Sequence, residues 1–236
     1  MATPINTQTR KVPTRPIYIL AANSNFSSCH KGPKKFIETI TSMYDIPKVN
    51  IRTCTWRRDF ISHSKWLMGH FTTKECTVIT YFAGHGDRIL DTSGDEEDGY
   101  DEYYIFNEGI LLDDQLTRLL LDTKPFSPNN LVVTVSDCCS SGSALDESIP
   151  DDYYKHTLHK QWLSLGATTD TEDAFVDGDG PVFTQILCEI LPQIATKLAR
   201  DWQQILLDTQ MKSWLGILQH FTVKMGSSVV NDMRVL

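Results

Sequence analysis

Two stretches of the sequence end in residues that could do covalent chemistry. In residues 130–142, a run of apolar and β-branched residues stops abruptly in polar residues around Cys139. Residues 76–86 have the same form and end in His85, which stands between two glycines. A cysteine thiolate is an efficient nucleophile when an imidazole lies within hydrogen-bond reach. We therefore predict that Cys139 and His85 are the nucleophile and the base of one protease site.

The other cysteines and histidines have plainer interpretations. A buried cysteine is usually an inert small hydrophobe, and this interpretation covers Cys29, Cys54, Cys76 and Cys188. Cys138 would point to the opposite side of its strand from Cys139, so we assign it to packing. We interpret the six histidines other than His85 as structural or solvated. No Cys or His pair has a second pair at the spacing of a zinc finger, which argues against zinc.

Strand-like and helix-like patterns alternate along the chain. The predicted strands are residues 17–22, 50–56, 77–82, 103–106, 131–135, 161–167 and 221–225. The predicted helices are a segment that opens at Pro33, residues 60–71, a segment after Asp114, and residues 182–198 and 201–218. Pro192 is expected to kink or split the fourth helix. This order predicts an α/β fold with a mostly parallel sheet covered on both faces. Ligands in such sheets bind beyond the carboxyl ends of the strands, where His85 and Cys139 would both lie.

The length and composition favour a single intracellular domain. The chain has 236 residues, and we place a mobile tail at residues 1–15 and one domain at residues 16–236. It carries 22 basic and 30 acidic residues, a net charge of −8, with no basic block that could follow a phosphate backbone. We therefore expect no nucleic acid partner. No apolar run approaches the roughly 20 residues that cross a bilayer, and a signal peptide is lacking, so we expect no membrane. Scattered cysteines indicate a reducing compartment, and we predict a cytoplasmic monomer whose sheet is assembled from one chain.

Two loops are strongly acidic, residues 91–102 and residues 170–179. The first supplies oxygen ligands at the first, third, fifth and twelfth positions of a calcium-loop template. It fails at the sixth position, where Glu96 replaces the required glycine, and a strand rather than a helix follows. The sequence therefore argues against a helix–loop–helix calcium site. Calcium bound by carboxylates from separate loops stays open.

Four motifs in a fixed order carry a resemblance to a known family. They are Tyr81-Phe-Ala-Gly-His85-Gly, Gly94-Asp-Glu-Glu-Asp-Gly-Tyr-Asp101-Glu, Leu112-Asp-Asp-Gln-Leu and Asp137-Cys-Cys139-Ser-Ser-Gly-Ser-Ala-Leu-Asp146. With them the chain resembles the metacaspases, the caspase-like cysteine peptidases of fungi, plants and protists. Weaker similarity covers residues 17–56 and the elements after residue 161. The chain looks like a type I catalytic core without a long prodomain, with a large-subunit-like part (16–146), a connection (147–160) and a small-subunit-like part (161–236).

The resemblance implies a fold and a reaction. The fold is a caspase-like α/β/α sandwich, and the reaction is cleavage of peptide bonds after Arg or Lys, usually dependent on calcium. His85 matches the family's base and Cys139 its nucleophile, with the backbone amides of Gly86 and Cys139 as the oxyanion hole. Asp137 matches an acidic residue at the base of the specificity pocket, where a carboxylate can pair with a basic side chain.

The resemblance also implies a metal site. The carboxylates that match the family's calcium ligands are those of Asp101, Asp113, Asp114 and Asp146. Four hard oxygen donors suit calcium. We expect calcium to activate the protein rather than take part in the chemistry, and we expect no organic cofactor.

Three residues depart from the family pattern. Gly32 stands where the family has a pocket aspartate, Ala83 where it has a serine before the Gly-His pair, and Ser140 where it has a histidine after the nucleophile. The first two remove polar groups from the predicted pocket. They keep a second hypothesis open, a catalytically weak or silent caspase-like domain that acts by binding other proteins. Cleavage after Asp is disfavoured because Asp137 would repel an acidic side chain. Self-cleavage after Lys155 or Lys160 is a further prediction.

Overall fold

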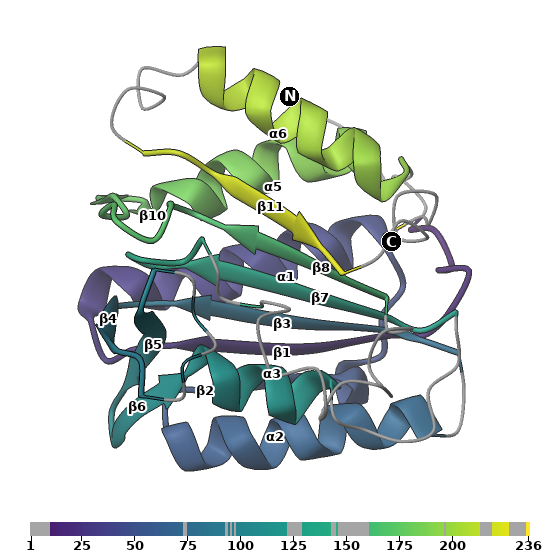
Figure 1. Cartoon of the computed structure of the whole chain (residues 1–236). Coiled ribbons are helices and arrows are strands. Elements are labelled where there is room, and N and C mark those ends of the chain that lie inside the picture. Colours follow the sequence, from purple (N-terminus) through teal and green to yellow (C-terminus); the bar gives the residue numbers. More distant parts are fainter. Residues whose placement is uncertain are drawn as a thin grey trace.

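The structure is a computed structural model that describes residues 10–72, 75–92, 94, 96, 98–121, 129–142, 145, 161–195, 197–212, 219–226 and 235–236. A central sheet lies between two groups of helices (Figure 1). Six strands form this sheet in the order β11-β8-β7-β3-β1-β2. Their bounds are β1 (Ile17–Asn23), β2 (Ile51–Cys54), β3 (Thr77–Ala83), β7 (Leu131–Asp137), β8 (Gln161–Gly166) and β11 (Thr222–Met225). All neighbours are parallel except β11, which runs antiparallel to β8 at one edge.

Helices cover both faces of the sheet. The first face carries α1 (Lys31–Met43), α5 (Val182–Ile194) and α6 (Ala199–Lys212), and the second carries α2 (Arg57–Gly69) and α3 (Asp113–Leu121). Each amphipathic helix buries one apolar stripe, for example Phe36 of α1 on the first face and Leu67 of α2 on the second. Short 3-10 helices are η1 (Ser27–His30), η2 (Lys48–Asn50) and η3 (His70–Thr72). The predicted α/β/α sandwich with a mostly parallel sheet is confirmed.

The residue types of the interior strands explain why these segments form strands in the middle of the sheet. All seven residues of β3 and all seven of β7 are buried. Strands that are covered on both faces need apolar or β-branched residues at nearly every position, and these two segments have that composition. Their neighbours β1 and β8 are buried to nearly the same extent.

The structure contains five further strands that the prediction from the sequence missed or gave different bounds. A three-stranded antiparallel sheet contains β4 (Gly86–Leu90), β5 (Tyr100–Phe106) and β6 (Gly109–Leu112), and a small hairpin contains β9 (Val176–Asp177) and β10 (Gly180–Pro181). The sequence predicted only the second half of β5. The strands β4 and β9 are mostly exposed, so no apolar pattern marks them, and their conformation depends on pairing with neighbours.

The proline in the fourth predicted helix does not break it. Helix α5 continues through Pro192 and ends at Ile194, and α6 begins at Ala199, two residues earlier than predicted. A proline in the last turn of a helix removes only one hydrogen bond, which explains the continuation. Residues 213–218 of the fifth predicted helix lie outside the described residues.

Part of the predicted tail contacts the domain. The N–H of Lys11 donates to the carbonyl of Met43, and the N–H of Asp45 donates to the carbonyl of Lys11, both at 2.9 Å. Arg15 Nε donates to Thr77 Oγ1 at 2.6 Å. The segment 10–15 therefore contacts the end of α1 and the start of β3. Residues 1–9 lie outside the described residues.

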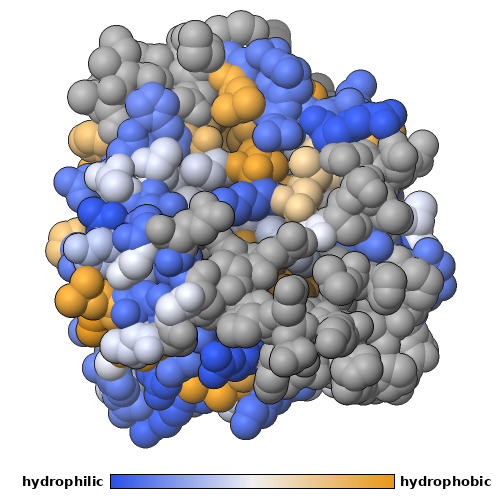
Figure 2. All heavy atoms as spheres, viewed as in Figure 1, coloured by the Kyte–Doolittle hydropathy of each residue, from blue (hydrophilic) through white to orange (hydrophobic). Residues whose placement is uncertain are grey.

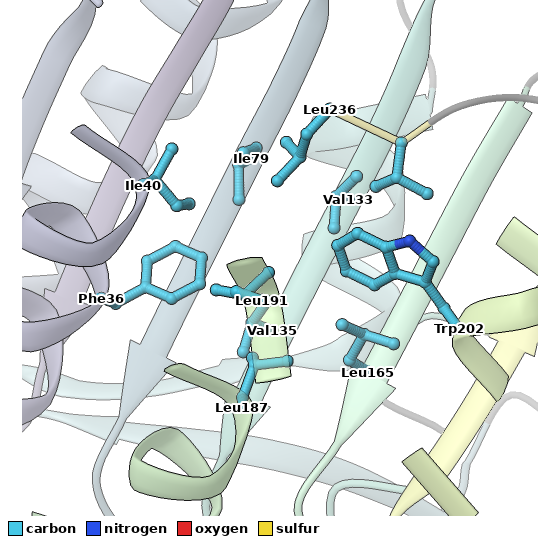
Figure 3. A pocket seen from close by; sticks show the side chains of 11 residues that line it. Phe36, Ile40, Ile79, Val133, Val135, Leu165, Leu187, Leu191, Trp202 and Leu236 are labelled. Atoms are coloured by element: carbon cyan, nitrogen blue, oxygen red, sulfur yellow. The ribbon is translucent and has the colours of Figure 1, made fainter. Parts of the chain in front are cut away.

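A small cavity lies inside the core of the first face. Its walls are apolar side chains from the sheet, from α1, α5 and α6, and from the chain end at Leu236 (Figure 3). The one polar side-chain atom among the lining residues, Trp202 Nε1, is buried and has no acceptor among the described residues. An apolar cavity of this kind stays dry and gives a polar ligand nothing to bind. It is a gap in packing rather than a candidate site.

Among the described residues, nine large apolar side chains are exposed. On the face in Figure 2, hydrophobic atoms form small separate groups between hydrophilic residues. Within the described ranges, no helix is both long enough and apolar enough to span a bilayer.

Candidate active site

The sheet places His85 and Cys139 at matching positions. Ala83 of β3 and Asp137 of β7 are register partners, so His85 and Cys139 each follow the sheet by two residues. The N–H of Gly84 donates to the carbonyl of Asp137 at 3.2 Å. Both loops therefore leave the carboxyl edge of the sheet side by side, as predicted from the sequence.

Glycine at position 86 lets the two loops approach closely. A Cβ at Gly86 would lie 2.3 Å from the carbonyl oxygen of Cys139 and 2.9 Å from the sulfur of Cys138. Neither neighbour can move away, because the first is backbone and the second is a fully buried side chain. The backbones of Gly86 and Cys139, the two predicted oxyanion donors, are thus in direct proximity.

The nucleophile candidate is in contact with a segment that follows β8. Cys139 is half-buried, and its Sγ accepts a hydrogen bond from the N–H of Ala174 at 3.3 Å. Burial raises the pKa of the thiol, and the charge and hydrogen bond of the adjacent Asp173 carboxylate raise it further. The hydrogen bond from Ala174 acts in the opposite direction and lowers the pKa, but the net effect is a raised value.

His85 has a different environment. Its side chain is exposed, and its ring packs edge-on against Phe26 with 4.7 Å between ring centroids. Within the described part of the chain, no hydrogen bond fixes the imidazole. The carbonyl of His85 accepts the N–H of Ile105 at 2.9 Å, which ties this loop to β5.

The segment 168–174 packs directly on the nucleophile loop. The N–H of Ser140 donates to the carbonyl of Glu172 at 3.2 Å, and Thr168 Oγ1 donates to the carbonyl of Cys138 at 3.2 Å. Ser140 has a φ of 48°, a strained value for a residue with a side chain. Glu172 in turn pairs with His220 and accepts its backbone N–H at 3.0 Å. The sequence marked this segment only as an acidic loop. Its position directly after β8, the neighbour of β7, is the signal that would have placed it here.

Asp137 is buried beneath the site and is bonded to α5. Its Oδ2 accepts the N–H of Thr184 at 2.7 Å and the hydroxyl of Thr184 at 2.5 Å. The N-cap residue Pro181 makes no side-chain hydrogen bond to the helix. Asp137 of β7 instead accepts a free backbone N–H in the first turn of α5, that of Thr184. Burial raises the pKa of Asp137 to about 7, although both bonds from Thr184 lower it. Its Oδ1 is buried without a partner among the described residues.

The structure brings the predicted pocket residues together. Asp137, Ala83 and Gly32 gather at the carboxyl edge of the first face, where a Cβ at Gly32 would lie 3.1 Å from the Cβ of Ala83. Tyr81, which the sequence did not single out, also belongs to this group. Its hydroxyl lies 2.6 Å from Thr184 Oγ1 and would be 2.3 Å from a Cβ at Gly32.

The predicted calcium ligands are only partly assembled. Asp113, the first residue of α3, is buried, and burial together with the charges of Glu102, Glu96 and Asp101 raises its pKa to about 9. Asp113 Oδ2 has no partner among the described residues. By contrast, the Asp114 carboxylate pairs with Arg118 at 2.8 Å.

No three acidic, His or Cys side chains in the described ranges are arranged to hold a metal ion. Asp146 lies outside those residues. Glu102, which fills the twelfth position of the calcium-loop template but is not among the four ligands that the family resemblance implies, is as buried as Asp113, at 3% exposed for each. Among the described residues, Glu102 and Glu96 therefore join the predicted acidic group, and the predicted member Asp114 is paired with Arg118.

Comparison with known proteins identifies the family. The family model described as the metacaspase, peptidase C14 domain, matches residues 25–148, which include both site loops. The chain belongs to this family of caspase-like cysteine peptidases. The resemblance predicted from the four motifs is confirmed.

Curated relatives match over part of their length. Metacaspase III c of Phaeodactylum tricornutum is 29% identical over 131 residues, which cover 50% of this chain and 38% of the relative. Metacaspase-1A of Aspergillus fumigatus is 40% identical over 74 residues, 30% of this chain and 17% of the relative. The matched segments thus span well under half of each of these proteins.

Solved structures share the fold over nearly the whole chain. A Geobacter sulfurreducens protein superposes with a TM-score of 0.65 at 16% identity, covering 93% of this chain and 97% of that protein. Caspase-1 from Spodoptera frugiperda superposes with a TM-score of 0.61 at 11% identity, covering 95% and 94%. The predicted caspase-like fold is confirmed.

Proposed function

We propose that this protein is a cysteine endopeptidase that uses His85 and Cys139 and cleaves peptide bonds after Lys or Arg. The observation that carries the proposal is the matched position of the two residues beyond β3 and β7, with the backbone of Gly86 against that of Cys139. The buried carboxylate of Asp137, at the same edge of the sheet, supports a basic substrate side chain.

The geometry suggests a sequence of steps. His85 accepts the thiol proton of Cys139, and the sulfur attacks the carbonyl carbon of the substrate. The N–H groups of Gly86 and Cys139 hold the negative oxygen of the tetrahedral intermediate. The imidazolium then donates its proton to the leaving amine, and water hydrolyses the remaining thioester. The charge of Asp173 raises the pKa of the Cys139 thiol, so movement of this carboxylate away from Cys139 would favour the thiolate.

The proposal is tested with peptides that release a fluorophore after Arg, Lys or Asp. We expect release after Arg or Lys from the wild-type protein, and loss of release in Cys139→Ala and His85→Ala. Cys54→Ala is the matched control, because Cys54 lies on the edge strand β2, away from the site. An absence of release after either basic residue, with and without calcium, contradicts the proposal.

We also propose that calcium activates the enzyme through the carboxylates of Asp101, Asp113, Asp114 and Asp146. The support is the buried Asp113 oxygen without a partner inside a group of hard oxygen donors. A divalent cation would neutralise these charges, and Asp114 would have to leave Arg118 to join. The acidic residues of β5 lie on the strand that is bonded to His85.

The metal proposal predicts stimulation by millimolar calcium that Asp113→Asn removes. Asp45→Asn, at an exposed carboxylate remote from the site, is the control. Equal activity in calcium and in chelator contradicts the metal proposal but leaves the peptidase proposal intact.

One observation favours a second function. The Asp173 carboxylate beside Cys139 raises the pKa of the thiol, and this suits a silent domain that acts by binding other proteins. Covalent labelling with an Arg-based inhibitor distinguishes the two. Labelling that disappears in Cys139→Ala supports the peptidase, and an unlabelled Cys139 supports the silent domain.

We further propose a monomer in a reducing, cytoplasmic setting. The support for the setting is that all six cysteines are free thiols.

A further inference from the structure

A chain of three hydrogen-bonding groups lies at the predicted specificity pocket, and the hydrogen-bond donors and acceptors fix its direction. The Thr184 hydroxyl has one proton, which it donates to Asp137 Oδ2 at 2.5 Å when that carboxyl is ionised. The 2.6 Å contact between Thr184 Oγ1 and the Tyr81 hydroxyl must therefore use the tyrosine proton. Tyr81 donates to Thr184, and Thr184 donates to Asp137.

This direction determines which acceptors are left for a substrate. Asp137 Oδ2 already accepts two hydrogen bonds, both from Thr184. Asp137 Oδ1 is buried and has no partner in the described part of the chain. The Tyr81 hydroxyl uses its proton in the hydrogen bond to Thr184, and its oxygen still has lone pairs that can accept a hydrogen bond. A basic side chain that enters beside Gly32 would meet one carboxylate oxygen and one neutral phenol oxygen, both of which are buried in this structure.

The space around these acceptors is narrow. The Tyr81 oxygen, the Cβ of Ala83 and the Cγ of Pro181 would lie 2.3, 3.1 and 3.3 Å from a Cβ at Gly32. The Tyr81 ring cannot swing away from this position. It is completely buried and stacks on Phe36 with 4.7 Å between ring centroids.

Lysine and arginine need different acceptors. The planar guanidinium of arginine gains most when both oxygens of a carboxylate face its fork, whereas the ammonium of lysine is a compact charge with separate donors. Here Thr184 occupies one carboxylate oxygen, and the Tyr81 hydroxyl fills the space beside Gly32. We infer that the pocket selects lysine over arginine, and that Tyr81 and Thr184 are the residues that determine this selection. The inference rests on the proposed peptidase function and specifies its substrate class.

The test compares two reporter peptides that differ only in Lys or Arg before the cut. We expect the kcat/KM of wild-type protein to be at least about tenfold higher for Lys, the usual cost of a buried polar group left unpaired. Tyr81→Phe should lower kcat/KM for Lys by about tenfold and leave that for Arg nearly unchanged. Thr184→Val should move the ratio toward Arg, because it frees part of Asp137 Oδ2.

A matched control separates specificity from stability. Tyr104 is also buried, and its hydroxyl lies 2.7 Å from Ser136 Oγ on the other face of the sheet. Tyr104→Phe therefore removes an equivalent hydrogen bond, and we expect it to leave the Lys to Arg ratio unchanged. A ratio at or below one in wild-type protein, or one that Tyr81→Phe and Tyr104→Phe change equally, overturns the inference.

Failure of the peptidase proposal can be told apart by a binding measurement. Calorimetry on Cys139→Ala compares peptides that end in Lys or Arg amides. If the wild-type protein cleaves neither reporter but the variant binds the Lys peptide about tenfold more tightly, the peptidase proposal fails and the selection stands. If the variant binds neither peptide, or binds the Arg peptide as tightly, the selection is overturned.

Discussion

Replacing Asp137 with asparagine should remove a pH dependence of folding that originates in one carboxyl group. Burial raises the pKa of Asp137 from 3.8 to about 7 in the folded protein, whereas the unfolded chain has the ordinary value. Between these two values the folded protein binds a proton that the unfolded chain has released. This stabilisation is fully present below the unfolded pKa and is lost as the pH rises through the folded pKa.

The size of the effect follows from the two pKa values. The full displacement is worth up to roughly 4 kcal/mol, of which about 2 to 3 kcal/mol is lost between about pH 5 and about pH 8. Asparagine has nearly the same shape, and its carbonyl can still accept the bonds from Thr184. The absolute cost of the substitution is therefore less informative than its change with pH.

The assay is urea unfolding, followed by tryptophan fluorescence at several pH values across this range. We expect the free energy of unfolding of the wild-type protein, relative to Asp137→Asn, to fall by about 2 to 3 kcal/mol from the acidic to the alkaline end. Asp179→Asn, at an exposed carboxyl group, controls for the loss of one negative charge. Stability curves of wild type and Asp137→Asn that run parallel with pH would refute the reasoning.

Three further substitutions test the site. Asp173→Asn should lower the pKa of Cys139, because it removes the negative charge that favours the thiol, and alkylation by iodoacetamide near neutral pH should become several-fold faster; an unchanged rate contradicts this contact. Gly86→Ala should abolish activity and lower the melting temperature, since its Cβ would meet the backbone of Cys139, whereas Gly69→Ala, with open space around it, should be tolerated. Ser140→Gly should raise the melting temperature through about 1 kcal/mol of relieved backbone strain, and a lower value would indicate that the serine side chain contributes more than the strain costs.

The buried strands were predictable because burial on both faces restricts the residue type at every position. In β3 and β7 each position is apolar, β-branched or hydrogen-bonded, and the register of parallel strands then places His85 beside Cys139. The residue types of β4 and β6 show no comparable restriction. Their conformation comes from pairing with β5, so a single sequence contains little information about them.

Parts of the site depend on contacts between residues far apart in the chain. Tyr81 resembles any other core aromatic in the sequence, and only the approach of Gly32 and Thr184 gives its hydroxyl a role. Likewise, the residue types in 170–174 do not indicate a contact with Cys139, and only the position of this segment after β8 predicts it. The pairing of Asp114 with Arg118 was readable in principle, because a four-residue spacing on a helix brings opposite charges together.

The contact between Gly32 and Tyr81 sets an order on how the pocket can change. Any side chain at position 32 would meet the Tyr81 oxygen at 2.3 Å, so a substitution there is damaging while the tyrosine remains. Loss of the tyrosine side chain first would open the space and permit a larger residue afterwards. Substitutions at positions 32 and 81 therefore have a required order, with Tyr81 replaced first. An evolutionary or laboratory route to a second pocket carboxylate passes through a variant without Tyr81.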